Sequence, residues 1–230
     1  MPNLATLIAP IIHSPQLAEI SQVIQQTLDD ERRLRNKFYA DVTPELKIEF
    51  IEGEVVLHSP ARNVHLDVTV WILKLMHTYV GMHQLGEVKS EKCLVVFPRN
   101  DYEPDVVYFG PAKAQSLQAD TMKFPIPDLV VEVLSESTEE RDRGLKFEDF
   151  EAHGVQEYWI VDAEAQIVEQ YLRQGETFDL KMKSGTGDLH SQTPFRLRCA
   201  SWVGARGAEE NSCIRKQMPG IMLGSNFLCL

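Results

Sequence analysis

A single glutamate interrupts the most apolar segment of the chain. Glu132 lies within Leu129–Leu134, where all five remaining residues are valine or leucine. A carboxylate is costly to bury alone, so a bound divalent cation, a positive side chain or a raised pKa must compensate it. Glu132 is therefore the first candidate for a functional residue; a structural ion pair and an exposed strand edge are the competing interpretations.

A second carboxylate stands at the start of another apolar run. Asp105 follows Pro104 and precedes Val106–Phe109, 27 residues before Glu132. If the two runs form neighbouring strands, both carboxylates converge at one place. Hard oxygen ligands of this kind suit Mg²⁺ or Mn²⁺ far better than zinc. The pair thus predicts a metal site, whereas Asp105 alone is equally typical of an aspartate that only begins a strand.

Three further polar residues are candidates with simpler structural interpretations. Lys146 lies on an expected helix, four residues after Asp142 and three before Asp149. That spacing is typical of an exposed ion pair on a helix face. Glu49 lies in a β-rich run, as a carboxylate on a strand face, and His65 lies on the polar side of an amphipathic helix.

Hydrophobic periodicity predicts three principal helices. Residues 15–38 carry an apolar stripe, with Ser14 as the N-cap and Pro15 at the first helical position. Residues 61–80 show the clearest amphipathic pattern in the chain. Ser137 and Glu140 form a capping box that opens a third helix, which should end at Gly154.

Alternating and continuous apolar runs predict the strands. Residues 47–58 read as a hairpin about Gly53. The other strand candidates are residues 87–89, 93–97, 105–109, 129–134, 157–161, 168–172 and 178–181. Because strands and helices alternate and the strands then cluster, we expect an α/β (α+β mixed) fold with a central mixed β-sheet flanked by helices.

The net charge limits the possible partners. Thirty-four acidic and 23 basic side chains give a formal charge of -11, which repels phosphate polyanions. A nucleic-acid role must therefore depend on a local site, and basic residues scatter through the region where a groove could form. These residues are Lys89, Lys92, Arg99, Lys113 and Lys123.

Several classes of protein are excluded by missing motifs. Cys93, Cys199, Cys213 and Cys229 include no C-x-x-C pair, which argues against a zinc module and a thioredoxin-like site. The chain has no nucleophile elbow, phosphate loop, dinucleotide-binding glycine motif or H-E-x-x-H motif. No stretch reaches about 18 apolar residues, and Leu4–Ile12 is too short for a signal peptide or membrane anchor, so we expect a cytoplasmic protein with reduced thiols.

An ordered set of motifs resembles the restriction-endonuclease-like family called Uma-two, of the PD-(D/E)XK nuclease superfamily. The likeness covers roughly residues 44–183 and extends to Met218–Ile221 as a closing segment. The motifs are Ile48–Glu54, His65 opening a helix, Glu103–Val107, Pro127–Ser135, Arg141 and Asp142 with Lys146, and Gly154–Asp162.

The resemblance implies a restriction-endonuclease core in which Asp105 and Glu132 bind Mg²⁺ or Mn²⁺ and the carbonyl of Val133 adds a neutral ligand. The metal would activate a water for in-line attack on a DNA phosphodiester. The superfamily usually places a lysine two residues after the glutamate, where this chain has Leu134. The resemblance therefore assigns the lysine's role, holding the attacking water, to Lys146.

Glu49 is, by the same resemblance, an additional acidic catalytic residue near the metal. We predict a restriction-endonuclease-like domain at residues 44–198, between a helical extension (1–43) and a partly irregular C-terminal segment (199–230). The leading function is a Mg²⁺-dependent endonuclease acting on DNA, as a homodimer. The alternatives are a non-catalytic homodimeric scaffold in which Lys146 neutralises Glu132, and a metal-dependent phosphoesterase acting on RNA or nucleotides.

Overall fold

The computed structural model describes residues 4–43, 46–185, 187–191 and 196–199. The helices are α1 (Leu4–Ile12), α2 (Leu17–Asp41), α3 (Asn63–His83), α4 (Pro111–Ala114), α5 (Glu139–Arg143) and α6 (Leu145–Ala152). The strands are β1 (Ile48–Ile51), β2 (Glu54–Leu57), β3 (Glu87–Ser90), β4 (Leu94–Val96), β5 (Asp101–Tyr102), β6 (Val106–Phe109), β7 (Lys123–Phe124), β8 (Leu129–Val133), β9 (Glu157–Asp162), β10 (Ile167–Gln174), β11 (Thr177–Ser184), β12 (Gly187–His190) and β13 (Arg196–Cys199).

The expected α/β (α+β mixed) class is confirmed, but the strands form two principal mixed sheets instead of one. The larger has six strands in the order β11-β10-β9-β8-β6-β3, and the smaller has five in the order β2-β1-β5-β4-β7. The β8–β9 pair is parallel in the larger sheet, and the β4–β7 pair is parallel in the smaller one. Strands β12 and β13 form a separate antiparallel pair.

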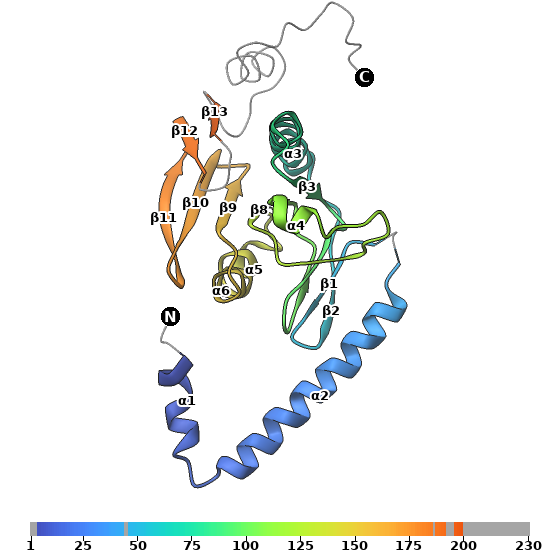
Figure 1. Cartoon of the computed structure of the whole chain (residues 1–230), viewed down its shortest axis with the longest axis vertical. Coiled ribbons are helices and arrows are strands. Elements are labelled where there is room, and N and C mark those ends of the chain that lie inside the picture. The colour runs from blue at the N-terminus through green and yellow to red at the C-terminus, as the bar shows by residue number, and fades with distance from the viewer. Residues whose placement is uncertain (1–3, 44–45, 186, 192–195, 200–230) are drawn as a thin grey trace, which may run out of the picture.

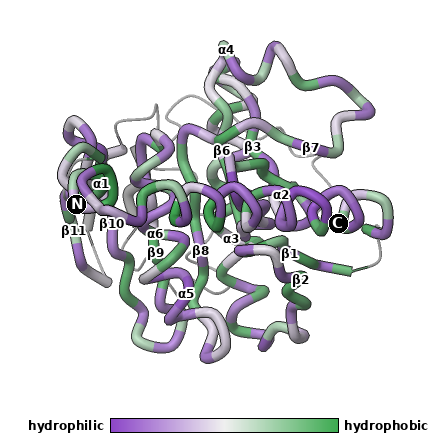
Figure 2. Tube along the Cα trace, turned by 90° about the horizontal axis from the view of Figure 1, so that it is seen from below, coloured by the Kyte–Doolittle hydropathy of each residue, from purple (hydrophilic) through white to green (hydrophobic). Residues whose placement is uncertain are grey.

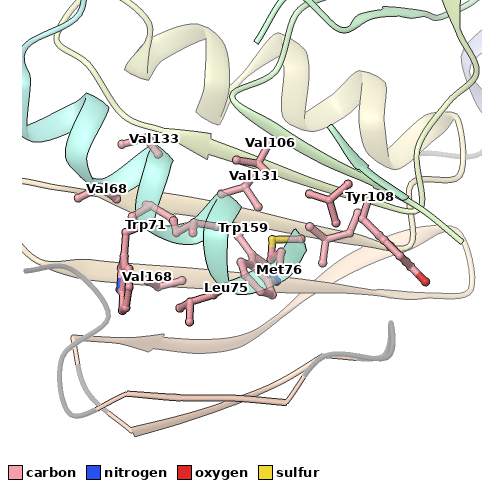
Figure 3. Close-up of a cluster of buried hydrophobic side chains, with 14 of the residues drawn as sticks. Val68, Trp71, Leu75, Met76, Val106, Tyr108, Val131, Val133, Trp159 and Val168 are labelled. Carbon is pink, nitrogen blue, oxygen red and sulfur yellow. The ribbon is translucent and has the colours of Figure 1, made fainter. Parts of the chain in front are cut away.

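Helix α3 covers one face of the six-stranded sheet (Figure 3). Trp71, Leu75 and Met76 from this helix pack on Val131 and Trp159 from the sheet. All five side chains are at most 7% exposed. The apolar stripe that predicts this helix from the sequence is therefore the face that packs on the sheet.

The opposite face of the six-stranded sheet packs on α6 and the smaller sheet. Val130 and Tyr158 contribute from the larger sheet, Phe150 from α6, and Ile51 and Tyr102 from the smaller sheet. Since successive side chains on a strand point to opposite faces, Val131 and Val133 face α3 while Val130 and Glu132 face α6 and the smaller sheet. Strand parity thus directs Glu132 into the space between the two sheets.

The predicted single helix from the Ser137 capping box to Gly154 is corrected to two short helices. The helix is interrupted at Gly144, where an added Cβ would lie 2.9 Å from the carbonyl oxygen of Glu140. The N-cap of α5 is Thr138 and makes no side-chain capping bond, so the capping box does not form. The predicted end is confirmed: α6 stops at Ala152, and Gly154 follows with φ +85°.

Two smaller predictions near the N-terminus have different outcomes. The helix predicted at residues 15–38 is α2, which begins at Leu17 with Gln16 as its N-cap, and Ser14 Oγ instead accepts the Gln16 N–H at 3.1 Å in the preceding turn. The hairpin is confirmed, because Glu52 and Gly53 adopt φ values of 51° and 89° between β1 and β2. Positive φ at both central residues is the pattern of a type I′ turn, whose twist matches that of the flanking strands.

Helix α2 reaches from the core to an N-terminal arm, defined here as residues 4–28 (Figure 1). At its C-terminal end Phe38 is buried against Phe50, and Arg35 donates to the buried carboxylate of Asp101. In the arm, every apolar side chain is at least partly exposed, and Figure 2 shows α1 coloured largely as hydrophobic.

The proposed domain division stays a prediction, and the segment 199–230 lies outside the described residues apart from Cys199. Within the part of the chain that the structure describes, no helix combines the length and apolar composition needed to cross a membrane.

The Arg35–Asp101 pair should hold α2 on the core. Asp101 is 0% exposed, and Arg35 also donates to the carbonyl oxygens of Phe97, Pro98 and Asn100. We predict that Arg35→Met lowers the free energy of unfolding by about 3 kcal/mol, because it leaves a buried carboxylate without its cation. The measurement is urea unfolding followed by circular dichroism.

Arg32→Met is the matched control. Arg32 pairs with Asp29 on the same helix, but its side chain is 68% exposed. An exposed pair of this kind contributes less than about 1 kcal/mol. Equal losses in the two variants would contradict the docking role of Arg35.

Candidate active site

Asp105 and Glu132 lie side by side on neighbouring strands. Strands β6 and β8 pair antiparallel with Val106 opposite Val131, and continuing this register by one residue sets Asp105 opposite Glu132. The backbone N–H of Asp105 donates to Glu132 Oε2 at 3.4 Å. The N–H of Val133 donates to Asp105 Oδ2 at 2.9 Å. The expected convergence of the two carboxylates is present in the structure.

Lys146 lies at the centre of three buried carboxylates. Its Nζ is 2.9 Å from Glu132 Oε1, 2.9 Å from Glu49 Oε1 and 3.4 Å from Asp142 Oδ1. The lysine is 2% exposed. Nζ donates a hydrogen bond to Glu132 Oε1, and Glu49 Oε1 lies at the same distance, whereas Asp142 Oδ1 makes no hydrogen bond. The interpretation of Lys146 as an exposed helix-face ion pair is therefore wrong.

Glu49 reaches this cluster from the smaller sheet. It lies on β1, is 0% exposed, and accepts the backbone N–H of Glu103 at 3.0 Å. Its second oxygen is 3.0 Å from His58 Nε2 and 3.9 Å from the guanidinium of Arg141. A strand-face position was expected, but this face points into the junction of the two sheets.

Asp105 has two cationic neighbours of its own. Lys47 Nζ donates to Asp105 Oδ1 at 2.8 Å, and His65 Nε2 lies 3.4 Å from the same oxygen. His65 is 9% exposed. The prediction of a histidine on the polar side of the helix is therefore wrong, because the first turn of α3 points this side chain at the site.

The pKa directions follow from burial and from these neighbours. Burial raises the pKa of Glu132 above its usual range; Lys146 opposes this, while Asp142 and Asp105 add to it. Burial also opposes the charge of Glu49, but Lys146 and His58 outweigh it and lower its pKa to about 2. The pKa of Lys146 is raised, because its carboxylate partners outweigh the cost of burial.

The cations around Asp105 show the same balance. Burial disfavours the charged forms of Lys47 and His65, yet Asp105 outweighs it and the pKa of each is raised. In return, His65 and Lys47 lower the pKa of Asp105 despite its burial. Asp105 is therefore ionised at neutral pH, the form in which a carboxylate binds a metal ion.

The donor set fits a hard divalent cation. Glu49, Asp105, Glu132 and Asp142 supply carboxylate oxygens, the ligand type that Mg²⁺ and Mn²⁺ prefer. Asp142 Oδ1 is buried and makes no hydrogen bond, which is unusual for a buried polar atom. Among the residues that the structure describes, no three His, Cys, Asp or Glu side chains are arranged so that they could hold a metal ion together. In this arrangement the ammonium groups of Lys146 and Lys47 pair with the carboxylates.

The structure gathers all four side chains predicted to do chemistry. Asp105, Glu132, Lys146 and Glu49 meet in one cluster. Val133 contacts Asp105 through its N–H, and the use of its carbonyl as a metal ligand stays a prediction.

Sequence reasoning missed three residues of the cluster. Lys47 alternates with Glu49 along the strand direction, a period-2 signal that places both on one face. Asp142 appeared as a helix neighbour of Lys146 and as part of a family motif, but it was given no role of its own. His58 carried no usable signal, because its contact with Glu49 depends on the hairpin register that pairs Ile48 with Leu57.

We predict that Lys146→Met destabilises the metal-free protein by about 3–5 kcal/mol, because it strips buried carboxylates of their shared cation. Urea unfolding measures this loss. Lys183→Met is the control, since Lys183 pairs with Glu169 at 2.9 Å while its side chain is 55% exposed. A loss for Lys146→Met no larger than that of the control would refute the central role of Lys146.

Comparison with known proteins shows which family the sequence matches. The model of Uma2, described as "Putative restriction endonuclease", matches residues 28–197. No curated protein matches the chain. A crystal structure described as "a putative nuclease belonging to DUF820 from Anabaena variabilis ATCC 29413" is similar, with a TM-score of 0.59 and 18% sequence identity.

That match covers 68% of this chain and 87% of the other. At this identity the likeness establishes a shared fold. The family match includes β1, β8 and α6, which carry Glu49, Glu132 and Lys146. It also includes Asp105, which immediately precedes β6. The chain therefore belongs to the Uma2 family of putative restriction endonucleases.

Proposed function

We propose that this protein is a metal-dependent endonuclease that hydrolyses the phosphodiester bonds of DNA. The observation that carries the proposal is the pair Asp105 and Glu132, set opposite each other on adjacent strands inside a cluster with more carboxylates than ammonium groups. Membership of a family described as restriction endonucleases supports a nuclease.

In this proposal Asp105, Glu132 and the carbonyl of Val133 hold a Mg²⁺ or Mn²⁺ ion. Such an ion supplies positive charge for the phosphate oxygens and lowers the pKa of water. Two backbone N–H groups already orient the carboxylates: that of Val133 on Asp105, and that of Asp105 on Glu132. This positioning reduces the reorganisation that metal binding requires.

The role of Lys146 is to fix the acidic residues and to balance their charge. Its contacts with Glu132 and Glu49 join the two sheets at the site. Holding the attacking water, the role that the resemblance assigns to Lys146, would require the N–H donor that Glu132 and Glu49 leave over, because Asp142 Oδ1 makes no hydrogen bond.

The decisive test is calorimetric titration of Mn²⁺ into the wild type, Asp105→Asn and Glu132→Gln. We expect one ion to bind the wild type and binding to be lost in both variants, because each replaces a carboxyl ligand with an amide. Glu164→Gln is the control, since Glu164 forms an exposed ion pair with Arg62. Nicking of supercoiled plasmid with Mn²⁺ should follow the same order. A folded wild type that binds no Mn²⁺, with or without DNA, would refute the proposal.

One contact also favours the non-catalytic alternative. A scaffold that retains the nuclease fold would use Lys146 to neutralise Glu132, and this pair is present at 2.9 Å. The same titration separates the two functions, because a scaffold has no need of the metal. A phosphoesterase acting on RNA or nucleotides would bind Mn²⁺ but cleave RNA or nucleotide substrates in preference to DNA of matched sequence.

We also propose that the protein is a homodimer joined through its arm. Monomers rarely expose apolar patches larger than a few hundred Å². The exposed apolar residues of the arm are Leu4, Leu7, Ile8, Ile12, Leu17, Val23, Ile24 and Leu28. Glu19 is the only Asp, Glu, Lys or Arg among residues 4–28, so two arms can meet without strong repulsion although each chain carries a charge of -11.

Light scattering during size exclusion tests the dimer. The 26.2 kDa chain should elute with twice its own mass. Ile24→Glu should halve that mass, because Ile24 lies on the apolar stripe and two glutamates would meet there. Gln26→Glu adds the same charge elsewhere on the helix and should leave the dimer intact. A monomeric wild type at tens of micromolar would contradict this assignment.

A further inference from the structure

The cations that border the carboxylate cluster differ in their access to solvent. The side chain of Lys146 is 2% exposed, whereas that of Lys47 is 22% exposed and that of Arg141 is 29% exposed. A group that contacts an external phosphate must reach the surface of the site. By this criterion Lys146 is too enclosed to contact a phosphate, and Lys47 and Arg141 remain as candidates for that contact.

Lys146 is enclosed by carboxylates rather than open to a phosphate. Its Nζ is 2.9 Å from Glu49 Oε1 and from Glu132 Oε1, and 3.4 Å from Asp142 Oδ1. Releasing one of these would leave a buried negative charge unpaired, which costs several kcal/mol. Its fixed position therefore suits a residue that shapes the site rather than one that contacts a substrate.

Lys47 is placed at the residues proposed to do the chemistry. Its Nζ is 2.8 Å from Asp105 Oδ1, and its charge also acts on Glu132. Its carbonyl accepts the N–H of His58, which anchors the backbone at the start of β1. Asp105 takes one of the three N–H donors of Lys47, so donors remain for a second acceptor.

Arg141 is less well placed for this role. Its guanidinium is 3.9 Å from Glu49 Oε2, whereas Lys47 Nζ lies 2.8 Å from Asp105, one of the two residues proposed to hold the metal. The more distant basic residues are engaged elsewhere: Arg99 pairs with Glu31, and Lys113 pairs with Asp128. Lys47 is thus the accessible ammonium that contacts Asp105 directly.

We propose that Lys47 binds the substrate, donating from Nζ to a non-bridging oxygen of the DNA phosphodiester held at Asp105 and Glu132. This inference rests on the proposed nuclease function and assigns its phosphate contact. It separates two roles between two lysines: Lys146 holds the carboxylates, and Lys47 contacts the phosphate. It also supplies a local positive group that a chain with a charge of -11 requires to accept a polyanion.

The first experiment measures binding of a 30-base-pair DNA duplex by fluorescence anisotropy at several NaCl concentrations, with Ca²⁺ in place of Mg²⁺. Lys47→Met should weaken binding and reduce the slope of log affinity against log salt by about 1, the effect of losing one phosphate contact. Lys47→Arg should restore the slope. Lys113→Met is the matched control, because Lys113 is also ion-paired and partly exposed, and it should keep the wild-type slope.

Mn²⁺ titration shows whether Lys47 acts on the phosphate or on the metal ligands. Lys47 competes with a cation for Asp105, so Lys47→Met should bind Mn²⁺ at least as tightly as the wild type. Loss of Mn²⁺ binding in Lys47→Met would overturn the proposal, because Lys47 would then only support the carboxylates. An unchanged salt slope in Lys47→Met would overturn it as well.

A footprint on the wild-type protein avoids any folding defect of the variants. Acetylation of surface lysines is followed by mass spectrometry with and without the duplex. Lys47 should be protected by DNA while Lys113 is not, and equal labelling of Lys47 in both states would overturn the proposal. If the wild type binds neither Mn²⁺ nor DNA, the proposed function itself fails and this inference with it. If it binds and cuts DNA while Lys47→Met behaves as Lys113→Met, only this inference fails.

Discussion

The buried ammonium of Lys146 is the contact on which the candidate site depends. It joins Glu49 of the smaller sheet, Glu132 of the larger sheet and Asp142 of α5 to its own helix α6. Isolated burial of any of these groups would be strongly unfavourable, so each stabilises the others in place. The relative position of the two sheets and the chemistry of the site therefore have a common cause.

The break between α5 and α6 serves the same arrangement. Gly144 permits a close approach to the carbonyl of Glu140, and the two short helices place Asp142 and Lys146 on the side facing the strands. Tyr158, buried on β9, donates from its hydroxyl to the carbonyl of Asp142 and fixes the end of α5 against the sheet. The catalytic proposal thus depends on backbone geometry as much as on charge.

Much of the fold and half of the site follow from sequence patterns. Apolar runs locate β6 and β8, and their alternation places Asp105 and Glu132 on one face once the strands are known to be neighbours. Burial of Lys146 could not be predicted, because its spacing from Asp142 is the same for an exposed helix pair and a buried one. The contact of Lys47 with Asp105 joins residues 58 positions apart, and only the tertiary fold reveals it.

The acidic surface and a nuclease function are compatible if positive charge is concentrated at the site. Arg99 and Lys113 are paired with acidic side chains away from the cluster, so they offer little attraction to DNA. The cations that contact Asp105 and Glu49, such as Lys47 and Lys146, are held by ion pairs at the site. Substrate affinity should therefore come from short-range contacts and the bound metal rather than from long-range steering.

The most direct test of the account is a crystal structure of the protein grown with Mn²⁺, in which anomalous scattering locates the ion. The account predicts an anomalous peak that marks a Mn²⁺ ion coordinated by carboxylate oxygens of Asp105 and Glu132, with Lys146 still in contact with Glu49. A well-ordered cluster without a peak, in which Lys146 and Lys47 keep their pairs with Glu132 and Asp105, would contradict it. In that case these carboxylates would be structural, and the fold would serve a purpose other than metal-dependent hydrolysis.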